Sequence, residues 1–291
     1  MRGCSIPRRG LLAVFLVLAF QFSDGMEWPG TDAVTDFNFA WNQSGRPTLG
    51  YGFRTQGPVR SVNSGQIIFS RDESDTGLPS PLGVWIAIDH GDGLIGVYGH
   101  LNRISTGALH TVAEGDIVGF SGNSGYAKDD GFYFSFYDRK EKRWVNPGMI
   151  LPLKSHNRLP VVRSIFLQNE TGQRFNLSQT RIFTQGTYRI LVDAVEAQLS
   201  ANDTPLAPHR LVCSVNGQET GSLAFETLGV RQGTLLVSTR NSLIEAGPVF
   251  ASYPSLDLGE VSLNRGQAAI EIIIQDLSGN SRDLNFRLVV E

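Results

Sequence analysis

The sequence predicts an all-β protein of two domains. Glycine is frequent, with 32 residues in a chain of 291, and strongly periodic helical segments are hard to find. Short runs of β-branched and aromatic residues recur instead between turn signals, which is typical of β-strands. With 41% hydrophobic and 18% charged residues, the chain can bury a sizeable core and is long enough for two domains of ordinary size.

The N-terminus, residues 1–25, is predicted to be a signal peptide. Arg8 and Arg9 precede a nearly uninterrupted apolar run from Leu11 to Phe22. A basic segment followed by about a dozen apolar residues is typical of an export signal, and it is shorter than the roughly 20 residues that span a bilayer. We therefore expect an exported protein with no transmembrane segment after cleavage.

Charge and cysteine content exclude two other classes of protein. Residues 1–25 hold three arginines and one aspartate, so 22 basic and 27 acidic residues remain without them, a net charge of −5. An acidic chain of this kind gives no indication of nucleic-acid binding. Cys213 is the one cysteine beyond the signal peptide, so no intramolecular disulfide is possible and the core must hold the fold.

The first domain is predicted at residues 45–155, after an N-terminal extension at 26–44 that is expected to pack on it through its aromatic residues, Trp28, Phe37, Phe39 and Trp41. A turn-rich connector, residues 89–93, is of the kind that closes a hairpin. The expected strands of this domain are Gln66–Phe69, Val84–Ile88, Leu94–Tyr98, a short strand within 115–125, and Phe132–Tyr137.

The second domain is predicted at residues 160–291, beyond a linker that ends at Pro160. Turns separate its candidate strands at intervals typical of an immunoglobulin-like β-sandwich, although strand spacing alone does not separate a sandwich from a barrel. These candidate strands are Val161–Leu167, Thr187–Val192, Arg210–Val215, Thr234–Ser238, Ala269–Gln275 and Asn285–Val290.

Four motifs follow one another in a specific order. They are Ile88-Asp89-His90-Gly91, Val97-Tyr98-Gly99-His100-Leu101, the glycine-rich run from Gly115 to Gly125, and Asn146-Pro147. In this order and spacing, residues 45–152 resemble the lysostaphin/LytM-type (β-lytic) peptidoglycan zinc metallopeptidases. The resemblance implies that family's duplicated-hybrid-motif β domain, with antiparallel sheets forming a groove for a glycan-peptide substrate. Gly186–Ile190 and Asp276–Asn280 are similar to immunoglobulin-like modules found beside such domains.

The metal ligands of that family are replaced in this chain. The family holds zinc with a His-x-x-x-Asp motif and a His-x-His strand, and hydrolysis needs such ligands and an open position for water. The first motif corresponds to Thr48 and Gly52, or else it is deleted between Arg54 and Val59. In the second motif a catalytic histidine becomes Tyr133 and a ligand histidine becomes Ser135. His100 remains as a vestigial catalytic histidine, so the resemblance implies a domain without metal or other cofactor.

Other histidines are not expected to rebuild the zinc site. His90 lies in a turn where the family also has a histidine without ligand duty, and His110 lies in a loop. His156 and His209 fall outside the first domain. Convergence of three ligands with supporting hydrogen bonds is a demanding requirement.

A binding groove is the alternative use of the same strand. Because side chains alternate across a strand, Tyr133, Ser135 and Tyr137 share one face, and Phe134 and Phe136 are expected in the core. If the groove persists, these hydroxyls and aromatic faces, together with His100, suit contact with sugars or peptide stems. The competing interpretation is that side chains fill the groove, that His100 is an ordinary paired histidine, and that the domain is a scaffold.

The sequence therefore predicts a non-catalytic, peptidase-like envelope protein that binds peptidoglycan or regulates a cell-wall hydrolase. Two alternatives stay open. One is an active peptidoglycan metalloendopeptidase with a rearranged zinc site, and the other is a purely structural envelope protein. Resemblance of fold to a hydrolase does not carry the activity over, since the site decides it.

Overall fold

A computed structural model describes residues 26–30, 32–73, 79–107, 109–153, 156–196, 204–240 and 242–291. The predicted signal peptide lies outside the described residues. The all-β prediction is confirmed, because the described residues contain only two short helices, η1 (Pro147–Met149) and α1 (Ala246–Phe250). No helix in the described part of the chain is long and apolar enough to cross a membrane.

The N-terminal half is a sheet system centred on one long strand, β8, which pairs with β7, β10 and β11. Strand β11 also pairs with β4, and β4 with β1, while β6 joins the other side of β7. The strands of this half are β1 (Val34–Phe37), β2 (Asn42–Gln43), β3 (Arg46–Pro47), β4 (Tyr51–Arg54), β5 (Pro58–Arg60), β6 (Gly65–Arg71), β7 (Val84–Asp89), β8 (Leu94–Ile104), β9 (Thr111–Val112), β10 (Ile117–Ser121), β11 (Gly131–Asp138) and β12 (Arg143–Val145).

The core of this half follows the alternation expected for β11. Phe134 and Phe136 are fully buried, and Phe134 packs against Tyr98 of β8 with ring centroids 5.0 Å apart. The predicted turn between β7 and β8 is also present, since His90 N donates to Leu94 O. Local sequence patterns therefore place the strand face on which the candidate site lies.

The C-terminal half consists of two sheets whose buried side chains share one core. One sheet has the order β14-β13-β16-β21, and the other runs from β15 through β23, β22, β17 and β18 to β19 and β20. Its strands are β13 (Val161–Gln168), β14 (Arg174–Asn176), β15 (Ile182–Phe183), β16 (Gly186–Val195), β17 (Arg210–Val215), β18 (Gln218–Arg231), β19 (Thr234–Ser238), β20 (Leu243–Glu245), β21 (Leu256–Leu263), β22 (Gly266–Gln275) and β23 (Ser281–Val290).

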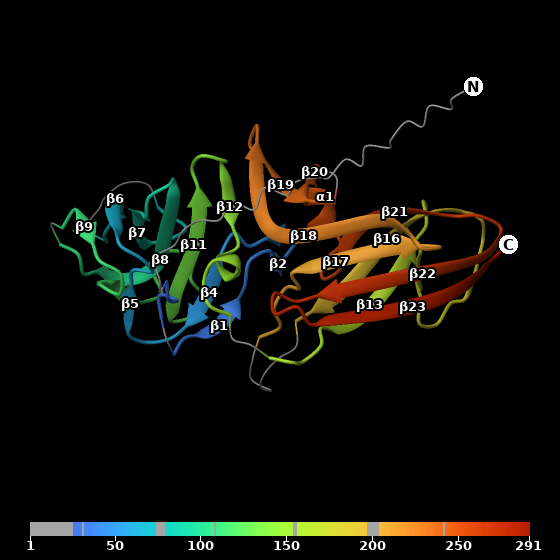
Figure 1. Cartoon of the computed structure of the whole chain (residues 1–291), viewed down its shortest axis with the longest axis horizontal. Coiled ribbons are helices and arrows are strands. Elements are labelled where there is room, and N and C mark those ends of the chain that lie inside the picture. The colour runs from blue at the N-terminus through green and yellow to red at the C-terminus, as the bar shows by residue number, and fades with distance from the viewer. Residues whose placement is uncertain are drawn as a thin grey trace, which may run out of the picture.

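The two halves lie end to end and are joined by backbone pairing (Figure 1). Strand β12 pairs with the long β18, with Trp144 opposite Leu228. Directly after β12, the Asn146 side chain donates to Phe225 O, and Asn146 N donates to Glu226 O. The sheet of the first half therefore continues into the second without a flexible break at this point.

The N-terminal extension contacts both halves. Its strand β1 pairs with β4, whereas the Asn42 side chain donates to Phe250 O in α1. Asn38 exchanges two hydrogen bonds with the backbone of Ala207, at 2.8 and 2.7 Å. The extension thus ties the halves together.

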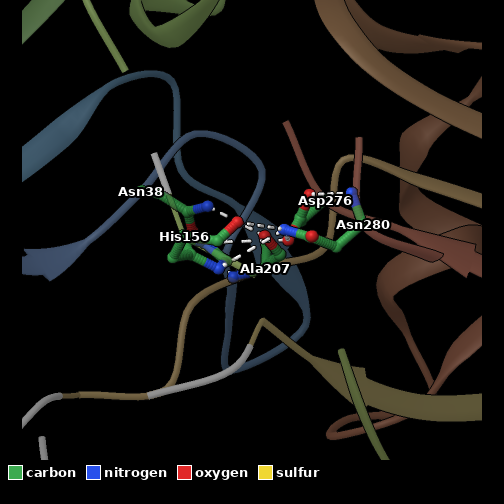
Figure 2. Close-up of polar contacts among 5 residues, drawn as sticks. All are labelled: Asn38, His156, Ala207, Asp276 and Asn280. Carbon is green, nitrogen blue, oxygen red and sulfur yellow. Dashed lines mark hydrogen bonds and ion pairs between the residues drawn. The ribbon is translucent and has the colours of Figure 1, made fainter. Parts of the chain in front are cut away.

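A buried polar cluster lies next to this contact (Figure 2). Asp276, at the end of β22, is 2% exposed and accepts hydrogen bonds from the backbone N and the side-chain Nδ2 of Asn280, both at 2.8 Å. Asn280 Nδ2 also donates to His156 O, and His156 Nε2 lies 3.7 Å from Asp276 Oδ2. The turn between β22 and β23 is thereby bound to the segment that links the halves.

Candidate functional site

Three neighbouring strands bring the predicted site residues together. Tyr133 of β11 lies opposite Gly52 of β4 on one side and opposite Gly99 of β8 on the other. His100, which follows Gly99, has a positive φ of 60°, a conformation uncommon for residues other than glycine. Its backbone N donates to Leu82 O rather than to a neighbouring strand, so β8 is irregular at this residue.

The His100 ring is held in one orientation. Its Nδ1 lies 2.9 Å from Ser124 O, and because a carbonyl only accepts, Nδ1 carries the proton and Nε2 is left as an acceptor. Burial lowers the pKa of His100, and the hydrogen bond to Ser124 opposes that shift. The imidazole is therefore neutral at pH 7 and meets the Tyr133 ring edge-on, with centroids 6.0 Å apart.

Tyr133 and Ser135 lie against Gly50, the residue directly before β4. A Cβ atom added to Gly50 would lie 2.8 Å from the Tyr133 hydroxyl and 2.7 Å from Ser135 Cβ, so only glycine leaves room for both side chains. Burial raises the pKa of Tyr133 to about 12, against the effect of its hydrogen bond with Ser135. Ser135 itself is 2% exposed, which removes it from any surface that a ligand could reach.

Phe37 covers Gly52, the glycine within β4. It pairs with Gly52 in the β1–β4 ladder, and a Cβ atom added to Gly52 would lie 2.2 to 2.7 Å from three carbons of its ring. The same ring lies 6.5 Å from the Tyr133 ring. An aromatic side chain from the extension thus fills the space into which a side chain at residue 52 would project.

Comparison with known families identifies this half of the chain. Residues 47–147 match the model described as Peptidase family M23. These residues form an M23 peptidase domain. The resemblance to the lysostaphin/LytM-type family is thereby confirmed for this domain. A second family model, which carries no description, matches residues 159–291.

Several solved structures are similar to the M23 domain. The catalytic domain of a mutant of the prophage-encoded M23 protein EnpA from Enterococcus faecalis is 24% identical over 39% of this chain and 88% of that chain, with a TM-score of 0.33. The catalytic domain of lysostaphin from Staphylococcus simulans is 24% identical over 37% and 81%, with a TM-score of 0.32. The SpoIIQ-SpoIIIAH pore-forming complex is 17% identical over 44% and 92%, with a TM-score of 0.34. No curated protein sequence matches the chain.

Thr48, Gly52 and Ser135, which the resemblance sets at the ligand positions of the family, do not fit a zinc ion. The Thr48 hydroxyl accepts from Trp41 N and donates to Asn38 O at 2.5 Å, so it is occupied in holding the extension. Gly52 has no donor atom, and Ser135 offers a neutral hydroxyl where zinc prefers imidazole, thiolate or carboxylate. Among the described residues, no group of three or more His, Cys, Asp and Glu side chains is placed to hold a metal.

The remaining predicted residues lie away from this centre. Tyr137 packs edge-on against Trp144 of β12, with centroids 5.1 Å apart, so it faces the junction with the second half. His90 contacts Ser64 O and the Tyr98 hydroxyl, whereas His110 is exposed. The structure brings together His100, Tyr133 and Ser135 and adds Phe37, which sequence reasoning placed in the extension but not in the site.

Proposed function

We propose that the protein is a non-catalytic M23-type module of the bacterial periplasm or cell envelope that binds peptidoglycan or regulates a cell-wall hydrolase. The observation that carries the proposal is the Phe37 ring over Gly52, a residue that the resemblance sets at a metal-ligand position. The predicted signal peptide at residues 1–25 supports export.

The chemistry left at the former site suits binding. Tyr133 turns its hydroxyl toward Gly50 and Ser135, while its half-buried ring lies between the rings of Phe37 and His100. His100 keeps one ring nitrogen as an acceptor. Aromatic faces beside a neutral hydrogen-bonding group are suited to sugar rings and peptide stems, since they gain contact area without desolvating a charge.

Cosedimentation with purified peptidoglycan sacculi tests the binding proposal. We expect the protein to pellet with sacculi and Tyr133→Ala to bind about tenfold more weakly, the equivalent of one lost aromatic contact. Tyr137→Ala is the matched control, because Tyr137 lies on the same strand but packs on Trp144, and it should bind as the parent does. Equal binding by both variants and the parent would exclude this face. If the parent does not pellet, peptidoglycan binding is wrong and regulation of a cell-wall hydrolase remains. That function is tested by measuring whether the protein changes the rate at which a purified hydrolase degrades sacculi.

Release of soluble fragments from sacculi in added zinc tests the absence of catalysis. We expect none. Turnover that a chelator abolishes would establish the alternative of an active metallopeptidase with a rearranged site and would contradict the proposal.

A further inference from the structure

A polar pocket of about 430 Å³ opens at the end of the β8–β10 pair, apart from the former metal site. It contains none of His100, Tyr133, Ser135 or Tyr137. Its lining comes from the segment after β4, from β8, from β10 and the turn that follows it, and from the residue before β11. The lining residues that matter are Gln56, Asn102, Arg103, Phe120, Asn123 and Asp130.

The floor of the pocket is backbone fixed by short contacts. Gly57 N donates to the Ser121 hydroxyl at 2.9 Å. Gly122 exchanges two 2.8 Å backbone hydrogen bonds with Gly131, and a Cβ atom added to Gly122 would lie 2.4 Å from Asn102 N. The pocket is therefore held in shape before a ligand arrives, which reduces the entropic cost of binding.

One wall of the pocket carries the Arg103 guanidinium, whose N–H groups are available to a ligand. The Arg103 guanidinium lies 4.0 Å above the centre of the Phe120 ring, and these two residues are cross-strand partners in the β8–β10 ladder. In the described part of the chain, no carboxylate lies within ion-pair distance of Arg103. The cation–π contact holds the guanidinium over Phe120. Its N–H groups remain for a carboxylate, which a guanidinium binds with two parallel hydrogen bonds.

The remaining lining supplies an acceptor. Asp130 is exposed, and its Oδ2 accepts a long hydrogen bond of 3.4 Å from the Gln56 side chain. An aspartate carboxylate accepts several hydrogen bonds, so this one retains capacity for an ammonium group. The side-chain amides of Asn102 and Asn123 add donors and acceptors suited to a peptide bond.

We infer that this pocket binds a short peptide, with the free carboxylate of the peptide on Arg103 and its amino group on Asp130. The pocket volume falls within the lower part of the range of small-molecule sites, which suits about two amino-acid residues. This inference does not rest on the proposed function, because the residues that carry it are different.

Three dipeptide probes separate the contacts. Glycylglycine has both charged ends, glycylglycine amide lacks the carboxylate, and N-acetylglycylglycine lacks the ammonium. We expect glycylglycine to shift the NMR signals of the Asn102 and Asn123 side-chain amides and of Gly57 N–H with a Kd of about 1 mM, the strength of a small ligand with few contacts. The amide should bind at least tenfold more weakly, and the acetylated form severalfold more weakly.

Variants assign the two charged ends. Arg103→Gln should abolish the response to glycylglycine, and Arg103→Lys should restore part of it, since lysine keeps the charge but not the fork. Asp130→Asn should bind glycylglycine and its acetylated form with equal affinity. Arg139→Gln is the matched control, because Arg139 is exposed in the same half but pairs with Asp89, and it should respond as the parent does.

Three results would overturn the inference. They are equal binding of glycylglycine and its amide, an unchanged response in Arg103→Gln, or binding of glucuronate, a carboxylated sugar, in preference to all three peptides. The last result would place a sugar carboxylate on Arg103 and exclude the peptide. Tyr133→Ala weakens sacculus binding and Arg103→Gln abolishes dipeptide binding, so failure of one proposal is distinguishable from failure of the other.

Discussion

The former metal site and the junction between the two halves both bury polar side chains, but they do so by opposite means. Around Gly52, which the resemblance sets at a metal-ligand position, the ring of Phe37 fills the space above the backbone, and the polar groups beside it are neutral. At the junction, ionisable groups are buried side by side. Asp276 lies 3.7 Å from His156, and the Glu196 carboxyl is close enough to Asp276 for that charge to affect its pKa.

The difference shows that the buried ionisable groups of this comparison lie at the junction and not around Gly52. Burying a charge is costly unless it is paired and hydrogen-bonded, so a cluster that keeps several ionisable groups loses stability when any one partner is removed. In this molecule such a cluster lies between the halves, whereas aromatic rings pack around Gly52 and Tyr133. Three predictions test this contrast, taken from the largest expected effect to the smallest.

Removal of the Asp276 carboxylate should have the largest effect. Asp276→Ala removes the acceptor of Asn280 N and one of the two acceptors of Asn280 Nδ2, and it takes the carboxylate away from His156. This should lower the free energy of unfolding by about 4 kcal/mol. Urea denaturation followed by tryptophan fluorescence measures it. Asp283→Ala is the control, because Asp283 is exposed in the neighbouring strand and should change stability by less than about 0.5 kcal/mol. Equal losses for the two variants would show that the junction is not held by this carboxylate.

Glu196 should make stability depend on pH. Burial, with a further contribution from the Asp276 charge, raises the pKa of Glu196 to about 8, although Leu277 N–H opposes the shift. Since this pKa is higher in the folded than in the unfolded chain, the protonated carboxyl stabilises the fold fully below pH 4.5, and that stability is lost as pH rises toward and through 8. From pH 5 to pH 8 the loss should be about 3 kcal/mol.

The Glu196→Gln variant isolates that effect. Its free energy of unfolding should not fall in this way. In parallel urea titrations the variant should therefore become more stable relative to the parent as the pH rises from 5 to 8. The parent also carries His90, His100 and His209, whose pKa values are lowered by burial. These histidines cost stability as pH falls through their unfolded pKa, the opposite sign, and they are common to both proteins. A constant difference across the pH range would mean that Glu196 is ionised in the fold.

Local patterns in the sequence predicted one side of this comparison better than the other. Alternation along Phe132–Tyr137 and the motif around His100 placed the site residues on adjacent strands, because period and turn chemistry are local properties. Phe37 over Gly52 and Asp276 beside His156 join residues far apart in the chain, and no local signal encodes such contacts. Strand β18 was also missed, since its polar residues and glycines do not alternate cleanly, although it is the strand that receives β12.

The smallest effect concerns the filled site itself. Gly52→Ala places a Cβ atom inside the volume of the Phe37 ring, so the ring must move, at a cost of about 2 kcal/mol in the free energy of unfolding. Gly229→Ala is the matched control, because no atom lies within 4 Å of the Cβ that it adds to β18.

The double variant tests whether the cost belongs to this pair. In a Phe37→Ala background the ring is absent, so Gly52→Ala should cost nothing further, and a double-mutant cycle should give a coupling of about 2 kcal/mol. If the losses in the free energy of unfolding were additive, Phe37 would not occupy the space above Gly52. The contrast between an apolar filled site and a charged junction would then be wrong for the site. Full coupling would mean that glycine at residue 52 is required by the aromatic ring above it, so that any larger side chain could be accepted at this residue only after Phe37 had been replaced.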